Sequence, residues 1–537
     1  MRRFRIAIIG AGPTALYCLK HLTRTFEPLM MTIFSPSDEF GNGMPFTAKL
    51  NGEFMLCNAF SREIPPVTQT LLQWLQQLPA RELNDWELSR HELSGRAFYP
   101  RVLIGDYLKD AFKDIAKLAE GAGHDLKLVP NACISDVRLP RPATVVIDAG
   151  QEGSELEFDA LILATGHSWD GQPALDKATL ISPWPYTNVT SLPPGNIGVL
   201  GSSLSAIDAV LALGFARGDF SEDKGQISWH PRQDAETLRI TMVSKSGVMP
   251  EGDFYYPFPY LPLLHITEDA VAAEVSKGQT DLLHRVFLLL KRELSEADPG
   301  YLARLGSDAE TIEGFCEFYF KDRTTLGGLA AVKDGFAEAR QSMRDRRTIP
   351  HRYVLLRAHE TFDRALRVLN EEDWKTFQST LHPVFGDAYA AVPHLSLARI
   401  IAMYDAGVLD LVATGEDALF EDQPEGGVDI VMNEERLHFD AMVDCRGQAS
   451  APLDDLPFPH IVRELVDGQS PIAEPFKIKL QNPGSAPIYC LSMPQLLERH
   501  PFAQGLSETE GRSAAVVNDL MSLLKADAGP KDQRQPP

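Results

Sequence analysis

A glycine-rich turn between an apolar run and an apolar helix constrains the fold of this chain more than any other feature. The chain opens with RIAIIGAGPTALYCLKHL (5–22), which predicts a buried strand over 5–9, a turn over 10–13 and a helix over 14–22. Gly10, Gly12 and Ala15 stand at the three positions of a GxGxxG/A fingerprint. The first permits the tight turn, the second lets the backbone approach a pyrophosphate, and the third lets helix and strand pack closely. A strand, this turn and a helix in succession predict a dinucleotide-binding unit.

The same pattern occurs a second time in NIGVLGSSLSAIDAVLAL (196–213). It predicts a strand over 197–200, a loop from Gly201 to Ala206 through Leu204 and Ser205, and an apolar helix from 207. Ser203 replaces the second glycine, so its side chain would crowd a pyrophosphate, although its hydroxyl could also bond to one. Two readings remain open: this unit binds a nucleotide, or it keeps the fold and binds none.

Two similar segments close the two units. EFDALILATGH (157–167) and HFDAMVDCRGQ (438–448) both read Phe-Asp-Ala, an apolar run and then a glycine. Each follows an alternating stretch typical of a β-meander, so we expect Gly166 and Gly447 at the carboxyl ends of parallel strands, where ligands bind. The second unit is longer, and helical periodicity over about 265–385 predicts a helical insertion there.

Composition excludes several classes of function. The formal net charge of -23 disfavours nucleic acid and anionic membranes as partners, and no apolar run approaches the ~20 residues of a membrane helix. The six cysteines show no CxxC spacing and the histidines no HExxH motif, so we expect neither a disulfide framework nor a metal site. The basic N-terminus superficially resembles a signal peptide, but its apolar run is short and ends in the glycine pattern. We expect a cytoplasmic protein with a small-molecule substrate, and nothing in the sequence indicates an oligomeric state.

Two dinucleotide units in tandem, with an ATG motif closing the first, resemble the two-dinucleotide-binding-domain flavoproteins. Among these, the chain is most similar to the bacterial FAD/NAD(P)-binding domain family. The motifs that carry this likeness are FGNGMPF (40–46), SREIPP (61–66), ATGH (164–167), GSSLSAIDA (201–209), DFYYPFPYLPL (253–263) and RGQ (446–448). PPVTQTLLQWL (65–75) and AFYPRVLIGDYLKDAF (97–112) give a more distant likeness to flavin-dependent N-hydroxylating and Baeyer–Villiger monooxygenases.

The resemblance implies an α/β fold with two Rossmann-like dinucleotide-binding domains, the second inserted in the first and carrying the helical insertion. FAD would bind a discontinuous domain of residues 1–190 and 450–525, and NAD(P)H a domain of residues 191–449. The C-terminal residues 526–537 lack apolar side chains, which predicts a disordered tail.

The resemblance also implies which residues meet FAD. The pyrophosphate would lie at the first turn, and Gly166 would lie close to the cofactor. The second strand of such proteins usually ends in a carboxylate that bonds the adenosine ribose; here Ser35 stands at that place, and Asp38 could reach back. PFAQGLSETEGRSAAVVNDLM (501–521) resembles the returning segment whose helix begins near the flavin. The residues expected at FAD are Gly10, Gly12, Pro13, Thr14, Ala15, Ser35, Asp38, Gly166, Gly505 and Leu506.

The second unit would bind the nicotinamide nucleotide through Gly201, Ser203, Leu204, Ser205 and Gly447. The strand after its fingerprint helix, LRITMVSKSG (238–247), ends in Ser-Lys-Ser rather than in an acid. An acid would prefer the 2′-hydroxyl of NADH, whereas Lys245 suits the 2′-phosphate of NADPH. The alternatives are NADPH with Lys245 as a ligand, or NADH with Lys245 as a solvated surface charge.

Catalytic residues are the least determined part of the sequence. His167 could meet the flavin edge as a donor or acid, or it could make a structural hydrogen bond. Cys57 could lie near the flavin or in the core, and the aromatic segment 253–263 could line a pocket or form a wall. Arg446 could contact a phosphate or pair with a carboxylate.

Three functions are compatible with these patterns. The first is an NAD(P)H-using FAD enzyme of monooxygenase type, or a related reductase; the missing CxxC argues against the disulfide-reductase branch. The second is a flavin enzyme, and the third a non-catalytic redox-responsive binding protein. In both of these the second unit no longer binds a nicotinamide.

Overall fold

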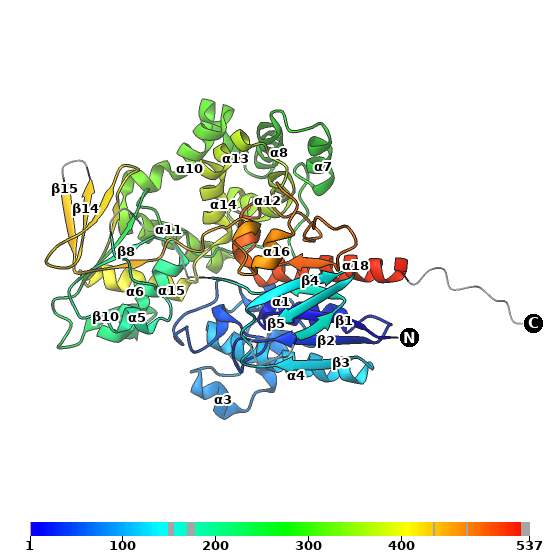
Figure 1. The fold of residues 1–537 in the computed structure, drawn as a ribbon. Coiled ribbons are helices and arrows are strands. Elements are labelled where there is room, and N and C mark those ends of the chain that lie inside the picture. The colour runs from blue at the N-terminus through cyan, green and yellow to red at the C-terminus, as the bar shows by residue number, and fades with distance from the viewer. Residues whose placement is uncertain are drawn as a thin grey trace, which may run out of the picture. The chain divides into compact units, whose positions relative to one another are not determined.

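The chain folds into two compact units in the computed structural model, which describes residues 2–148, 155–168, 175, 178–432, 435–468 and 471–527 (Figure 1). Unit 1 comprises residues Met1–Ala48, Ala59–Ser168 and Ala449–Pro537. Unit 2 comprises Lys49–Asn58 and Trp169–Gln448. The second unit is thus inserted in the first, as the sequence predicts.

A five-stranded parallel sheet forms the centre of unit 1. Its order is β17 (Ile488–Cys490), β7 (Ala160–Leu163), β1 (Phe4–Ile9), β2 (Leu29–Phe34) and β3 (Asp125–Val129). Helix α1 (Pro13–Leu22) packs against both α4 (Arg101–Gly121) and the C-terminal α18 (Leu506–Asp527). The apolar strand residues 6–9 and 160–163 are almost fully buried, so the sheet is covered on both faces, as parallel sheets are.

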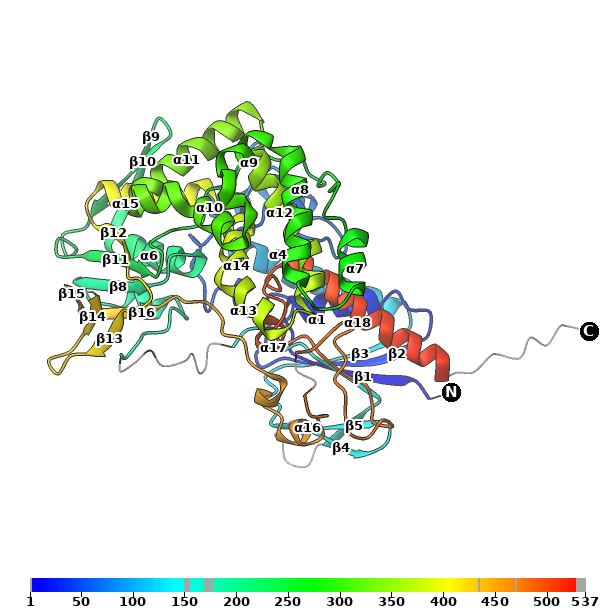
Figure 2. The same ribbon diagram turned by 90° about the horizontal axis from the view of Figure 1, so that it is seen from above.

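The remaining elements of unit 1 are short. An antiparallel meander of β4 (Asp136–Arg141), β5 (Thr144–Asp148) and β6 (Glu155–Phe158) leads into β7. The helices are α2 (Leu71–Gln77), α3 (Ala80–Asp85), α16 (Pro459–Arg463) and α17 (Met493–Leu497), with 3-10 turns η1 (Met44–Phe46), η2 (Ser61–Glu63) and η4 (Leu453–Asp455). α16 packs on β4, which Figure 2 shows from above.

Unit 2 repeats the strand order of unit 1. Its parallel sheet runs β16 (Ala441–Asp444), β8 (Asn196–Leu200), β11 (Arg239–Ser244) and β12 (Leu409–Ala413), which corresponds to β7, β1, β2 and β3. A meander of β13 (Leu419–Asp422), β14 (Val428–Met432) and β15 (Glu435–Phe439) precedes β16, as the first meander precedes β7. Ile181 makes a parallel bridge to Val443 on β16 and so takes the place that β17 has beside β7.

Other elements of unit 2 connect these strands. α5 (Thr187–Thr190) precedes β8, and α6 (Leu204–Arg217) follows it. A hairpin of β9 (Gly218–Asp223) and β10 (Gln226–Pro231) separates α6 from β11.

The predicted helical insertion lies between β11 and β12. Its elements are α7 (Glu268–Ser276), α8 (Leu282–Ala297), α9 (Pro299–Leu305), η3 (Gly306–Glu310), α10 (Ile312–Leu326), α11 (Gly328–Asp345), α12 (Pro350–Leu366), α13 (Glu371–Ser379), α14 (Leu381–Tyr389) and α15 (His394–Asp405). The α/β fold with two Rossmann-like domains and a helical insertion is therefore confirmed.

The repeated Phe-Asp-Ala motif fixes the start of each central strand. Asp159 Oδ2 accepts a 2.9 Å hydrogen bond from the Arg5 amide, and the Asp159 amide donates to the Arg5 carbonyl at 2.8 Å. Asp440 makes the same pair of bonds with Asn196, each at 2.7 Å. Two bonds per aspartate set the register of β7 on β1 and of β16 on β8, which explains why the motif occurs twice.

The contact division between the two units falls at residues 168 and 448, beside the predicted domain limits of about 190 and 450. Residues 49–58 and 169–190 belong to unit 2, because Phe54 stacks on Phe215 at 4.7 Å and the Tyr186 amide bonds to the Leu50 carbonyl. α18 extends through residues 526 and 527, and the rest of the predicted disordered tail lies outside the described residues.

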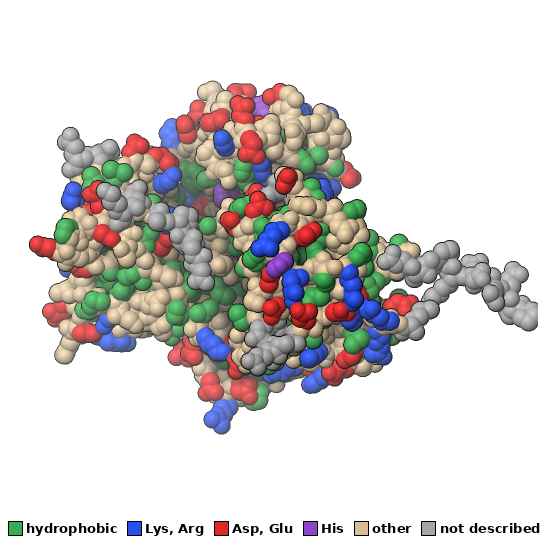
Figure 3. Space-filling view, in the orientation of Figure 1, with side chains coloured by type: hydrophobic (Ala, Val, Ile, Leu, Met, Phe, Trp, Pro, Cys, Tyr) green, Lys and Arg blue, Asp and Glu red, His purple; other side chains and the backbone are tan. Residues whose placement is uncertain are grey.

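Two expectations from composition concern the chain as a whole. Among the described helices, none is long and apolar enough to cross a membrane. On the face in Figure 3, acidic and basic side chains are interspersed.

Candidate dinucleotide sites

The first fingerprint turn can hold only glycine at position 10. Gly10 has φ +107°, and a Cβ there would lie 2.0 Å from the Ala164 carbonyl oxygen. Ala164 follows β7 directly and donates its amide to Ile9 at 2.7 Å. The closing ATG motif therefore abuts the opening turn, and a side chain would push the two strand ends apart.

A second glycine loop lies against the fingerprint. An ideal Cβ on Gly12 would be 3.3 Å from Gly43 Cα, and Gly43 has φ +64°. The amide of Gly41 donates to the Ala11 carbonyl at 2.7 Å. The motif FGNGMPF (40–46) carries part of the family likeness, but the sequence did not predict its contact with the fingerprint turn. Its signal was the pair of glycines two residues apart.

Helix α1 presents free amides where a pyrophosphate would bind. Pro13 is its first residue, and the first bond within the helix runs from the Leu16 amide to the Gly12 carbonyl at 3.1 Å. The amides of Thr14 and Ala15 precede this bond, so their N–H groups have no partner in the helix and meet the positive end of its dipole. A turn with glycine at positions 10 and 12, followed by these amides, fits a pyrophosphate.

Ser35 follows β2, as predicted for the ribose position, but its hydroxyl is engaged within its own turn. It donates to the Glu39 carbonyl at 2.9 Å and accepts from the Ser37 amide at 3.2 Å, and the residue is 1% exposed. The Glu39 carboxylate accepts from Asn42 and Thr47. Asp38, the other predicted ribose ligand, is exposed.

The ATG motif meets the segment that follows β17 in unit 1. Thr165 Oγ1 and Ser492 Oγ lie 2.7 Å apart, and the Met493 amide donates to the Gly166 carbonyl at 3.0 Å. Gly166 has φ +75° and open space at its Cβ position. Ser492 is buried and was missed by sequence reasoning, because it lies more than 300 residues from its partner.

Gly505 and Leu506 lie at the start of α18, where the resemblance expects them. The amide and the hydroxyl of Thr509 both donate to the Gly505 carbonyl. One turn further on, Ser513 Oγ donates to the Thr14 carbonyl at 3.4 Å. The returning helix therefore packs on the fingerprint helix.

His167 is partly buried behind the ATG glycine. Burial is the main cause that lowers its pKa to about 4, and the nearby Arg101 guanidinium lowers it further. The imidazole is therefore neutral near pH 7. It can accept or donate one hydrogen bond there but cannot supply a proton as imidazolium.

The second fingerprint repeats the first glycine but not the second. Gly201 has φ +128°, and a Cβ there would lie 2.6 Å from the Cys445 carbonyl oxygen, the counterpart of Ala164. Ser203 is exposed and caps α6 without a side-chain hydrogen bond to the helix. The first bond within α6 runs from the Ile207 amide to the Ser203 carbonyl at 3.0 Å, so the amides of Leu204 and Ser205 precede it.

Arg446 and Lys245 also lie at this sheet edge, and each pairs with a carboxylate. Arg446 forms a two-point ion pair with Asp444, at 2.9 and 2.7 Å, so the carboxylate alternative holds. Lys245 Nζ lies 2.5 Å from Glu416 Oε2, and both side chains are exposed. Gly447 has φ +93° and open space at its Cβ position, as Gly166 has.

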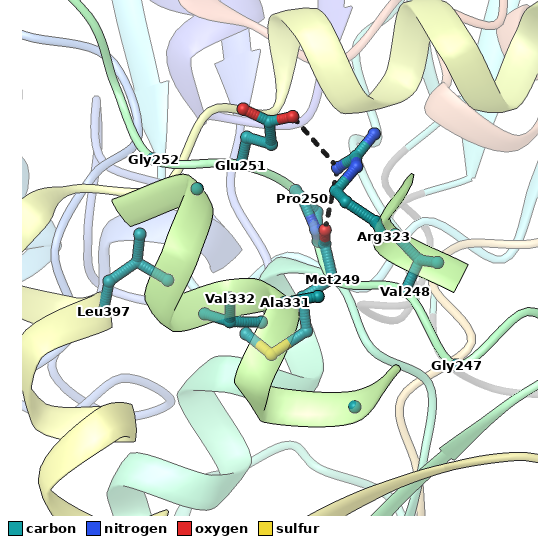
Figure 4. Close-up of a pocket in the computed structure, with 12 residues that line it drawn as sticks. Gly247, Val248, Met249, Pro250, Glu251, Gly252, Arg323, Ala331, Val332 and Leu397 are labelled. Atoms are coloured by element: carbon teal, nitrogen blue, oxygen red, sulfur yellow. Dashed lines mark hydrogen bonds and ion pairs between the residues drawn. The ribbon is translucent and has the colours of Figure 1, made fainter. Parts of the chain in front are cut away.

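A buried ion network includes Glu251 of the loop that follows β11, and Figure 4 shows the pair of Glu251 with Arg323. Glu251 pairs with Arg352 at 2.7 Å and with Arg323 at 3.5 Å, and Arg323 pairs with Asp387 at 2.9 Å. The adjoining pocket is lined by residues 247–252 of the loop and by α10 and α11, and its volume is about 10 Å³. That is room for about one water molecule.

The aromatic segment 253–263 packs against helix α12 of the insertion. Tyr256 stacks on Tyr353 of α12 with ring centroids 5.8 Å apart. Arg357, also on α12, lies over the Tyr353 ring at 4.2 Å and donates to the Leu261 and Pro262 carbonyls. These contacts fix the segment to the helical insertion.

The cysteines form no disulfide with one another in the described part of the chain. All six cysteines are free, and Cys57 is buried. Among the described residues, no group of His, Cys, Asp or Glu could hold a metal ion.

Comparison with known proteins agrees with this architecture. Residues 7–168 match a family model described as FAD-NAD(P)-binding, and residues 267–389 match the YdhS-like middle domain. The uncharacterised protein YdhS of Escherichia coli (strain K12) is 33% identical over 521 residues, which cover 96% of this chain and 97% of YdhS. The chain belongs to the YdhS family. The YdhS-like middle domain corresponds to α7–α14 of the insertion, and the expected FAD/NAD(P)-binding domain is confirmed.

Solved structures share the fold at low sequence identity. The ornithine N-hydroxylase of Kutzneria sp. 744 superposes with a TM-score of 0.50 at 14% identity, over 97% of this chain and 100% of that one. The L-lysine 6-monooxygenase of Pseudomonas syringae gives a TM-score of 0.49 at 13% identity, over 96% and 99% of the two chains. The first likeness shows a common two-domain flavoprotein fold, which confirms the predicted resemblance to N-hydroxylating monooxygenases at the level of fold.

Proposed function

We propose that this protein is an FAD-dependent oxidoreductase that uses NAD(P)H, with monooxygenase-like chemistry on a small organic substrate. Bound FAD would supply the redox chemistry by accepting hydride from the nicotinamide and passing electrons to O2. The residues of unit 1 proposed to hold FAD are those predicted above, with Asp38 at the ribose. Unit 2 would hold the nicotinamide nucleotide at Gly201, Ser203, Leu204, Ser205, Lys245 and Gly447.

One observation carries the proposal: each unit has a fingerprint glycine locked against its own closing motif. Gly10 meets Ala164 and Gly201 meets Cys445, with φ above +100° in both. Each turn leads directly into a helix whose first amides have no partner within the helix. This is the arrangement that binds pyrophosphate. Two such cradles in one chain favour two dinucleotides and hence hydride transfer between them.

The test begins with the cofactor of the purified protein. Flavin released by denaturation should be FAD, and Gly12→Val should not retain it, because a branched side chain would meet Gly43 and fill the cradle. Anaerobic NADPH or NADH should then bleach the flavin absorbance, and admitted O2 should restore it. FMN, or no flavin after reconstitution, would contradict the FAD assignment.

Ser203 favours a second candidate function. Its exposed side chain stands where a glycine would let the backbone approach a pyrophosphate. If unit 2 binds no nicotinamide, the protein is a flavin enzyme with another electron donor or acceptor, or a redox-responsive binding protein. This candidate predicts that neither nucleotide bleaches the flavin, and that Ser203→Gly creates nucleotide binding where the native chain has none.

A further inference from the structure

In unit 2, backbone hydrogen bonds continue to connect β11 and β12 after the last paired residues of the two strands. Ser244 pairs with Ala413 in register. After the strands end, the Thr414 amide donates to the Ser244 carbonyl at 2.9 Å and the Gly415 amide donates to the Lys245 carbonyl at 3.1 Å. These two bonds place Glu416 beside Lys245 through the backbone, independently of the side-chain ion pair.

The turn after Lys245 is fixed to the same platform. The Gly247 amide donates to Ser244 Oγ at 3.1 Å. Gly247 has φ +65°, and a Cβ there would lie 2.8 Å from Ala413 Cβ, so the turn packs directly on the end of β12. Lys245 and Glu416 consequently project from one rigid edge, with Nζ and Oε2 2.5 Å apart and with 71% and 75% of their side chains exposed.

A Rossmann-like unit binds the adenosine ribose of its nucleotide at the edge where this strand ends. An acid about 20 residues after the fingerprint usually bonds the 2′-hydroxyl, and a cation accommodates a 2′-phosphate. Here the β9–β10 hairpin lengthens the connection from α6 to β11, and β11 ends without an acid. Glu416, from the loop after β12, supplies a carboxylate at the same edge.

We infer that Glu416 determines nucleotide specificity at this edge: its carboxylate accepts the ribose 2′-hydroxyl and opposes a 2′-phosphate that Lys245 alone would attract. The inference deepens the proposed function and rests on it. In the native chain the ion pair offsets the positive charge of Lys245, so the preference for NADPH is weaker than this lysine predicts by itself. Removing the carboxylate frees the lysine and shifts the preference toward the 2′-phosphate.

The experiment measures binding of ADP-ribose and of 2′-phospho-ADP-ribose to the full chain loaded with FAD. These probes lack the nicotinamide ring, so no turnover complicates the measurement, and bound FAD occupies unit 1. Glu416→Gln should shift the ratio of the two dissociation constants toward 2′-phospho-ADP-ribose by about tenfold at low salt, the size of one like-charge contact at a surface. Raising the ionic strength should shrink this shift, because the groups are exposed.

Two variants serve as controls. Asp417→Asn removes a neighbouring exposed carboxylate of the same loop and should leave the ratio unchanged. Lys245→Ala should shift the ratio the other way, toward ADP-ribose. Thermal melts check that each variant folds, and the exposure of Glu416 predicts an unchanged melting temperature.

The outcomes separate the inference from the function it rests on. If both probes bind but Glu416→Gln leaves their ratio as in the native chain, or Asp417→Asn shifts it equally, the role of Glu416 is refuted while nucleotide binding stands. If neither probe binds the FAD-loaded native chain at millimolar concentration, the nicotinamide part of the proposed function fails and the inference fails with it.

Discussion

At the scale of single residues, each unit contains two kinds of glycine, which differ in the reason why a side chain is unfavourable. Gly10 and Gly201 combine positive φ with a carbonyl oxygen in the place of a Cβ, whereas Gly166 and Gly447 have positive φ and open space. The first pair is constrained by contact and the second by backbone conformation alone. Substitution by alanine should therefore separate the two kinds of glycine.

Gly10→Ala should destabilise unit 1 by more than about 3 kcal/mol, because the new methyl group would overlap the Ala164 carbonyl and the strand ends must separate. Gly166→Ala is the matched control. It should cost only the strain of the left-handed region, about 1–2 kcal/mol, and should keep FAD. Denaturant unfolding of both variants gives the comparison; equal losses would show that the close approach at Gly10 is relaxed in solution.

The neutrality of His167 leads to a prediction about pH. Its folded pKa of about 4 lies below the ordinary value of about 6.5, so the unfolded chain binds a proton first as the pH falls. This contribution to stability is fully present above pH 6.5 and is lost progressively as the pH falls toward 4. His167→Asn should make the loss of stability over that range shallower than in the native chain. A His167 ring signal that titrates near pH 6.5 by NMR would refute the assignment.

At the scale of elements, the Phe-Asp-Ala repeat joins a strand to the one that follows it by more than 150 residues. Asp159 is mostly buried, with 14% of its side chain exposed, and also pairs with Arg5 at 3.1 Å. Asp440 has 58% of its side chain exposed and bonds chiefly to the Asn196 amide. The same motif should therefore carry different energies in the two units.

Asp159→Ala should lower the free energy of unfolding by about 1.5–3 kcal/mol, the value of a charge-assisted hydrogen bond in a partly buried place. Asp440→Ala should cost about 1 kcal/mol or less, because solvent screens the group. Asp159→Asn retains an acceptor oxygen for the Arg5 amide and should lie between the two alanine variants. A larger loss for Asp440→Ala than for Asp159→Ala would reverse this account.

The elements of both units were predictable where the signal is local. The spacing of Gly10, Gly12 and Ala15 gave the turn and helix α1 to within a residue, because fingerprint and periodicity are properties of neighbouring positions. Ser492 and Gly43 escaped prediction because each acts through a residue distant in the sequence. Glu416 escaped for the same reason: only the pairing of β11 with β12 brings it to Lys245. The unit boundary near 49–58 depends on the stacking of Phe54 on Phe215, which no pattern in the sequence predicts.

At the scale of the whole molecule, two units with the same strand order serve two different proposed nucleotides. Unit 1 has the complete fingerprint and the returning β17, whereas unit 2 has Ser203 and the bridge at Ile181. The insertion interrupts only unit 2, between its second and third parallel strands. Damage to one closing motif should therefore affect one cofactor.

Gly166→Trp should impair FAD binding, because a large ring would project from the cofactor edge of the first sheet. Gly447→Trp should leave FAD bound and slow reduction by NADPH or NADH, since its ring would project from the second sheet only. Flavin content, anaerobic reduction rates and thermal melts of both variants test this division. If both folded variants lose FAD alike, the two segments serve one cofactor site.

The position of β17 also has a consequence for the order in which the protein is made. The sheet of unit 1 lacks its fifth strand and its partner for Thr165 until residues 488–492 have left the ribosome, whereas the sheet of unit 2 is complete at residue 444. Between β7 and β17 the ribosome must add residues 164–487, which include unit 2 from Trp169 to Gln448, and this takes roughly 15–65 s. The first fingerprint is thus synthesised before the sheet of unit 2, yet the sheet of its own unit closes later, so a nascent chain can bind FAD in a finished site only after residues 488–492 have emerged.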